Sequence, residues 1–357
     1  MLKLSCNPPE TFELLEHKHF EGLNKIIGTG QRRGLYAVAA PITKLHSAIR
    51  NHSGRKRAFF EWLWGINGGR LRAILIGKPP LLKMIVDSFN QKFPELVFSE
   101  QDADGNVNFN ALGNTVLDIF NYKRYRQSDM CLNYLSALGI RQATPCPYCN
   151  FDEIYLTEVN GDDYHYDEDE REAEANNYQQ ALLDLDHFFP KSRYPFLAIS
   201  LYNLVPSCHN CNSNFKHTKE FALETHVHPY MTDFEDIFTF SLKTPYVDGQ
   251  TYDTLEILYS NKAAYPDFPD NSIKDFRLIS RYNTKRETLL DMLKALHMGI
   301  FENFDQIFTD QQQGDIKKLI LRNAKIPFEH QEITKFQIGK LKRDIYLEFF
   351  QRKSNLA

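Results

Sequence analysis

The stretch LLDLDHFFPKSRYP, residues 182–195, places a carboxylate next to an imidazole at the end of a strand-like run. The alternation of Leu and Asp favours a strand, and Asp186 and His187 stand where it ends. A carboxylate can ligate a hard cation such as Mg²⁺, and a neutral imidazole can deprotonate water near pH 7. The flanking apolar residues predict that this end is held rigidly; they are Leu183, Leu185, Phe188 and Phe189.

Four of the six cysteines form two Cys-x-x-Cys pairs, Cys146/Cys149 and Cys208/Cys211. Four thiolates in two such pairs suit tetrahedral zinc, and in a chain without an export signal they favour metal binding over disulfides. A zinc ion joining the pairs would close a long loop that contains Asp186 and His187. We therefore expect a structural zinc site; the alternative is two unrelated reduced pairs.

Polar residues near these motifs complete what phosphodiester chemistry requires. Asn212 follows Cys211 directly and is expected to begin a short surface helix. Cations are needed to hold phosphates on either side of a scissile bond. Four are expected to do so: Lys191, Arg193, Lys216 and Lys219.

The motifs DLDHFFPKS, YNLVPSCHNCN and NFK together resemble the HNH, or ββα-metal, endonucleases, in the branch stapled by zinc. The resemblance covers about residues 146–220 and implies His187 as general base. It also implies Asp186 and Asn212 as ligands of a catalytic Mg²⁺ or Mn²⁺, and Asn203 as a brace for the loop and the imidazole. The structural zinc would be held by Cys146, Cys149, Cys208 and Cys211.

Composition is that of an ordinary globular protein, with 42% hydrophobic and 25% charged residues. The charge is uneven: residues 1–140 hold 18 Lys+Arg against 12 Asp+Glu, and residues 141–225 hold 6 against 15. An acidic run, 162–174, accounts for most of the central deficit and is interpreted as a solvated excursion. The basic first third could face a polyanion.

The predicted fold is mainly α with an embedded small α+β unit of the ββα-metal type. We expect helical regions at 1–140 and 226–357 around a nuclease unit at 141–225. Residues 114–139 read as one long helix and 174–183 as a short one, while 153–159 and 236–259 read as strands, the first leading into an Asn-Gly turn. The Gly-rich segment 28–34 lacks the ending of a phosphate loop and is interpreted as a loop.

Several polar residues have a structural interpretation beside the functional one. Asn203 could cap a turn and Asn212 a helix, and His209 is expected to be exposed. The basic segment 50–57 could contact duplex, or it could be a solvated start of a helix.

The favoured function is metal-dependent cleavage of nucleic acid, with DNA as the favoured substrate, by a cytoplasmic protein without a membrane segment. Helical flanks around such a unit resemble bacterial defence effectors, such as the HNH partner of an ATPase in Septu-type antiphage systems. That analogy implies an ATPase partner, because no nucleotide-binding motif is visible. The alternatives are a non-catalytic zinc module that binds nucleic acid or protein, and an RNase with the same site.

Overall fold

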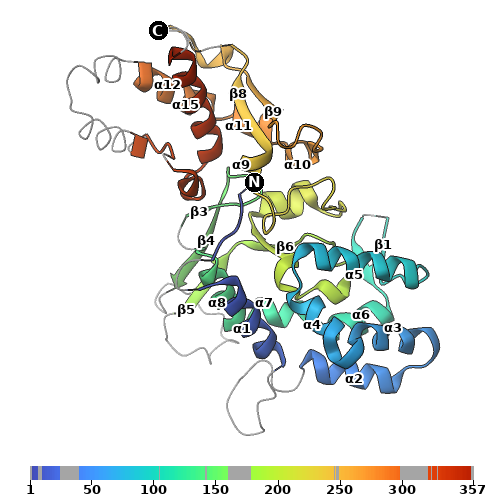
Figure 1. The fold of residues 1–357 in the computed structure, drawn as a ribbon. Helices are drawn as coiled ribbons and strands as arrows, with labels where there is room; N and C mark the ends of the chain where they lie inside the picture. The colour runs from blue at the N-terminus through green and yellow to red at the C-terminus, as the bar shows by residue number, and fades with distance from the viewer. Residues whose placement is uncertain are drawn as a thin grey trace.

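The computed structural model describes most of the chain (Figure 1). The described residues are 2–6, 10–24, 40–103, 105–140, 143–159, 178–244, 246, 249–297, 321–322, 324–327 and 329–354. Within them, helices predominate and the strands form small antiparallel sheets, in the orders β1-β2, β3-β4-β5, β6-β7 and β8-β9. This confirms the expected class, mainly α with small α+β parts. The loop at 28–34 and the acidic run at 162–174 lie outside the described residues.

The first part of the chain packs its helices around an aromatic core. Phe59, Trp62 and Phe89 contact one another and Phe196, a residue of the loop that follows the Asp-His stretch. The helical region is therefore joined to that loop by buried rings. Its elements are α1 (Phe12–Asn24), α2 (Pro41–Asn51), α3 (Gly54–Trp64), η1 (Ile66–Gly68), α4 (Gly69–Ile76), α5 (Pro79–Lys92), β1 (Ser99–Gln101) and β2 (Val107–Phe109).

The long helix predicted for 114–139 is wrong, because the chain forms three helices there: α6 (Ala111–Ile119), α7 (Tyr122–Arg126) and α8 (Asp129–Ala137). Asn121 accepts a hydrogen bond from the backbone N–H of Arg124, and Ser128 accepts one from that of Cys131. Each side chain caps a new helix, which explains the two breaks in the apolar periodicity.

The central region begins with a sheet of β3 (Thr144–Pro145), β4 (Glu153–Val159) and β5 (Tyr178–Leu182). The strand expected at 153–159 is confirmed. The short helix predicted across 174–183 is wrong where it is described, because Tyr178–Leu182 pairs with β4 in the register Tyr155↔Leu182. Ladder pairing overrides the weak helical preference of this segment. The Asn-Gly turn lies outside the described residues.

The Asp-His stretch forms β6 (Asp184–His187), which pairs with β7 (Leu204–Ser207) in the register Asp186↔Val205 and His187↔Leu204. Two 3₁₀ turns join them, η4 (Pro195–Leu197) and η5 (Leu201–Asn203), and a seven-residue π-helix, η6 (Asn210–Lys216), follows. Two strands and a helix therefore follow one another here. Because β6 is extended, Asp184 and Asp186 face one side of it and His187 the other.

The last part of the chain contacts the first cysteine pair. Ile338 donates a backbone hydrogen bond of 2.5 Å to Asn150, and Leu2 at the other end of the chain donates one of 2.6 Å to Pro147. The strands expected within 236–259 are confirmed. The elements are α9 (Phe234–Ile237), β8 (Phe238–Leu242), η7 (Tyr252–Thr254), β9 (Ile257–Asn261), α10 (Asn271–Asp275), α11 (Leu278–Asn283), α12 (Arg286–His297), η8 (His330–Lys335) and α15 (Gly339–Ser354).

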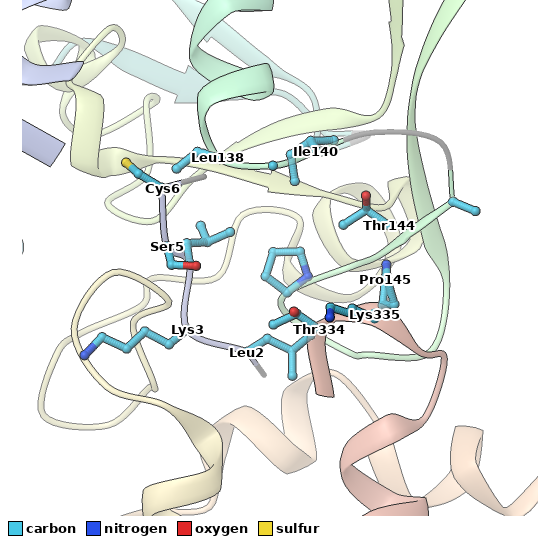
Figure 2. Close-up of a pocket in the computed structure, with 14 residues that line it drawn as sticks. Leu2, Lys3, Ser5, Cys6, Leu138, Ile140, Thr144, Pro145, Thr334 and Lys335 are labelled. Atoms are coloured by element: carbon cyan, nitrogen blue, oxygen red, sulfur yellow. The ribbon is translucent and has the colours of Figure 1, made fainter. Parts of the chain in front are cut away.

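The N-terminal segment, β3 and η8 enclose a pocket of about 340 Å³. Figure 2 shows Ser5 and Cys6 on one side of it, with Thr144 and Lys335 across. None of the residues lining this pocket belongs to β6, β7 or η6. No helix among the described residues is long and apolar enough to cross a membrane.

Candidate metal centre and Asp-His strand

The two cysteine pairs converge into one buried cluster. The four Sγ atoms lie within 4.8 Å of one another, and Cys149 and Cys208 are 4.0 Å apart between sulfurs. A tetrahedral zinc ion with Zn–S bonds of about 2.3 Å separates its sulfurs by roughly 3.8 Å. The cluster therefore has the donor set and the size for zinc, as the spacing predicts. Its members are Cys146, Cys149, Cys208 and Cys211.

Backbone N–H groups surround these sulfurs. Phe151 and Asp152 both donate to Cys149 at 3.4 Å, and Cys208 donates to Cys146 at 3.3 Å. Burial opposes ionisation of Cys149, but hydrogen bonds from the other three thiols and the nearby Arg281 hold its pKa well below the ordinary value. Burial and the neighbouring sulfurs raise the pKa of Cys211. Further ionisation of the cluster therefore needs a cation.

Arg281 of α11 brings a positive charge to the cluster. Its guanidinium donates to Cys211 Sγ at 3.5 Å and to Asp152 at 2.8 Å, and it lies over the rings of Phe151 and Phe215. Burial opposes its charge, but the Cys149 and Cys211 sulfurs raise its pKa. A zinc ion with four thiolates carries two negative charges, so Arg281 would offset one of them. Sequence reasoning missed this residue, since it lies 70 positions beyond Cys211.

Asp186 is enclosed by hydrogen-bond donors from the protein itself. Tyr148 donates to one carboxylate oxygen at 2.6 Å, and the ammonium of Lys216 donates to the other at 2.8 Å. Lys216 also bonds the carbonyl oxygen of His187. The Asp186 and Lys216 side chains are only 5% and 2% exposed. Lys216 was predicted to contact nucleic acid, but in this arrangement its charge faces the interior, because β6 packs on η6.

Asn212 lies beside Asp184, the acid two residues before Asp186. Its side-chain amide donates to Asp184 at 3.0 Å, and His209 and Ser213 also contact that carboxylate. Strand alternation places both acids on the face toward η6, where Asp184 meets Asn212 and Asp186 meets Lys216, four residues later. The structure therefore does not present Asp186 and Asn212 as a joint ligand pair for a divalent cation. His209 is exposed, as expected, at 74% of its side chain.

His187 lies on the opposite face of β6 and is held by the loop. Its Nε2 lies 2.9 Å from the carbonyl oxygen of Ala198. A carbonyl only accepts, so Nε2 carries the proton and Nδ1 keeps its lone pair. Burial, with the positive charge of Lys191, lowers the pKa of His187 to about 3. The imidazole is therefore neutral near pH 7, as a general base must be, but the same burial makes it a weaker base than an exposed histidine.

Asn203 is buried at the inner side of the loop. Its amide oxygen accepts from the backbone N–H of Phe189 at 2.7 Å, and its nitrogen donates to the carbonyls of Phe189 and Leu197 at 3.1 and 3.2 Å. These bonds tie the two ends of the loop together. Among the described residues, the ring of His187 is bonded by Ala198 and not by Asn203, so any effect of Asn203 on the imidazole acts through the loop.

Most of the cations expected to bind phosphates are paired within the protein. Arg193 forms an ion pair with Glu220, and Lys219 forms one with Asp275. In the basic segment at 50–57, Arg55 pairs with Glu95 and Arg57 with Glu61. The pair of Arg57 and Glu61, four residues apart on α3, is typical of a solvated helix start. This fits the structural interpretation of the segment.

Comparison with known proteins gives one similarity. The chain is 31% identical over 87 residues to the Septu protein PtuB of Bacillus thuringiensis, which covers 24% of this chain and 33% of that protein. The chain therefore matches about a third of the relative's length. No family model matches the chain, and no solved structure is similar to it.

Proposed function

We propose that the chain is a metal-dependent nuclease that cleaves DNA as part of an antiphage defence system. The observation that carries the proposal is the order β6–β7–η6, with both strands between two cysteine pairs that meet in one cluster and η6 beginning inside the second pair. In this order a histidine stands at a strand end, and both cysteine pairs meet in one buried cluster that could hold zinc. The partial similarity to a Septu protein supports the defence role, and a partner ATPase is part of the proposal by analogy alone.

His187 would act as the general base. The hydrogen bond from Nε2 to Ala198 fixes the ring and leaves the Nδ1 lone pair for a water molecule. The residue as a whole is only 9% exposed, so its reach to water is narrow. A histidine that is neutral and oriented can take the proton of the attacking water as the new P–O bond forms, while the bond from phosphorus to the 3′ oxygen breaks and that oxygen takes a proton from solvent.

Such chemistry needs a divalent cation, and we do not assign that cation to Asp186 and Asn212 together. Asp186 is neutralised by Lys216 and capped by Tyr148, and Asn212 bonds Asp184 instead. A hard cation beside a scissile phosphate would stabilise the charge that develops on it. The requirement for Mg²⁺ or Mn²⁺ is therefore part of the proposal, to be tested by omission.

Substitution of His187 tests the activity. Purified protein is incubated with plasmid, single-stranded DNA and structured RNA, with Mg²⁺, with Mn²⁺, or without added cation. His187→Ala should retain zinc and lower the cleavage rate about 10²–10⁴-fold, the usual cost of removing a general base. His209→Ala, in an exposed histidine of the same unit, is the matched control and should cleave like wild type. Equal rates for wild type and His187→Ala would refute the assignment.

The second candidate is a non-catalytic zinc module. The buried pair of Asp186 and Lys216 favours it, because a carboxylate with two internal donors is a stable structural feature. It predicts that wild type cleaves none of the three substrates with either cation, with or without a partner ATPase, while still containing zinc. Cleavage of RNA alone would instead favour the RNase.

A further inference from the structure

Hydrogen bonds connect helix α7 to the strand that carries Asp186 and His187 and to the residues before it. The Tyr122 hydroxyl donates to the carbonyl of Leu185 at 3.2 Å. Four residues later, on the same face of the helix, the Arg126 guanidinium donates to the carbonyls of Ala181 and Leu183 at 3.0 and 2.8 Å. These bonds fix α7 against the edge formed by β5 and β6.

The ring of Tyr122 contacts both the imidazole of His187 and the ammonium of Lys191. Its centroid is 4.7 Å from that of His187, with the planes at 66°. The ammonium of Lys191 lies over the same ring, 4.7 Å from its centroid. A cation over an aromatic face is attracted to the ring without losing its charge. Lys191 is therefore held against the ring that His187 also contacts, while its partial burial lowers the pKa of its ammonium.

Among the residues that the structure describes, Lys191 and Lys123 differ from Arg193, Lys216 and Lys219 in having no acid partner. Lys191 has no carboxylate within ion-pair distance among the residues that the structure describes, and the same holds for Lys123, which is exposed on α7 next to Tyr122. Arg193, Lys216 and Lys219 are each paired with an acid. An acid partner cancels most of the field that a phosphate would feel, and an exposed pair must open before its cation can bind elsewhere.

We propose that Lys191 and Lys123 form the phosphate-binding edge of the site: Tyr122 of α7 holds Lys191 next to His187, and Lys123 is the next, exposed residue of that helix. This inference rests on the proposed function and names the contacts through which the nucleic-acid backbone is held next to the base. The sequence also predicted phosphate contacts at Arg193, Lys216 and Lys219. The proposal places the contacts instead on the face of β6 that carries His187. The ligand is the sugar-phosphate backbone, and Tyr122 is a positioning residue.

The salt dependence of binding tests this edge. Affinity of the full chain for a labelled DNA duplex is measured by fluorescence anisotropy from 50 to 200 mM salt, without added divalent cation. Each phosphate contact contributes about 0.9 to the slope of log K against log salt. Lys123→Ala/Lys191→Ala should lower the slope by about 1.8 and weaken binding by about tenfold per lysine at 0.1 M salt. The matched control, Arg193→Ala/Lys219→Ala, should leave the slope unchanged.

Zinc content and circular dichroism establish that each variant is folded. Tyr122→Phe keeps the ring and should bind like wild type, whereas Tyr122→Leu removes the surface under Lys191 and should lower the slope. An unchanged slope in the lysine double variant would overturn the proposal, as would an equal loss in the control or a wild type that does not bind. The binding assay measures no cleavage, so it tests the phosphate-binding edge separately from the nuclease activity. If wild type binds with the expected slopes but cuts nothing in the cleavage assay, only the nuclease assignment is refuted.

Discussion

The two centres that the motif joins are assembled to different degrees. At the cysteine cluster, four side chains from two distant segments meet at the spacing of a zinc site. At the acid centre, Asp186 and Asn212 each find other partners, Lys216 and Asp184. A short motif therefore determines its own geometry when all of its metal-binding atoms are equivalent. It fixes less when neighbouring side chains can compete for the same carboxylate.

The surroundings of the two centres explain this difference. Backbone hydrogen bonds from Leu2 and Ile338 hold the residues beside the first cysteine pair. Arg281 places a positive charge next to the sulfurs. The acid centre depends on two contacts along one helical face, four residues apart. Only one of the two acids on β6 is enclosed there, and it is the one beside the buried lysine.

Removing one sulfur should have the largest effect. Cys211→Ser takes away a zinc ligand, and zinc binding contributes about 10–16 kcal/mol to folding in small zinc domains. We expect loss of bound zinc and loss of a cooperative unfolding transition in the central region, measured by metal analysis and thermal denaturation. Cys131→Ser is the control, a buried cysteine outside the cluster, and should keep its zinc. Zinc-free wild type that is folded and active would contradict the role of the cluster.

The buried ion pair should give the next largest effect. Asp186→Leu or Lys216→Met alone leaves an unpaired buried charge and should cost about 3–5 kcal/mol of unfolding free energy. The double variant leaves neither charge and should be more stable than either single variant, measured by urea denaturation at neutral pH. Additive losses across this cycle would mean that the two side chains do not stabilise each other. The centre would then be open to a cation in solution.

The sequence predicted the elements with a strong local signal. Short-range patterns predict the paired cysteines and the strands at 153–159 and within 236–259, and the folded chain has them. The long helix at 114–139 was not predictable from periodicity alone. Two capping side chains, Asn121 and Ser128, compete with the apolar pattern there.

The site was predictable in its residue types but not in its pairings. Nothing local marks Lys216 as buried, since a lysine at the end of a polar helix usually faces solvent. The place of Tyr122 also depends on a break between helices and on contacts across some 60 residues. Only the folded chain shows which of these side chains, distant in sequence, lie next to each other.

Two further buried histidines, His19 and His228, predict a smaller, pH-dependent loss of stability. His19 of α1 bonds the carbonyl of Ile199 at 2.8 Å, and burial lowers its pKa to about 4. Burial, with the charge of Lys216, lowers the pKa of His228 to about 3. In the unfolded chain both have their ordinary pKa of 6.5. Below pH 6.5 the unfolded state therefore binds protons that the folded state does not, and stability falls with pH.

Urea denaturation at pH 7 and pH 5 measures this loss. Each histidine should contribute about 2 kcal/mol to the decrease in unfolding free energy between these values. Zinc sites also weaken in acid, because thiolates take up protons, so the wild type is compared with His228→Gln. The amide oxygen can still accept from the backbone N–H of Tyr230, as the imidazole does. We expect the variant to lose about 2 kcal/mol less than wild type on acidification, with equal bound zinc at each pH. Equal losses in both proteins would mean that His228 does not contribute, and that the pH dependence belongs to other groups, such as the cysteine cluster or His187, whose pKa is also lowered.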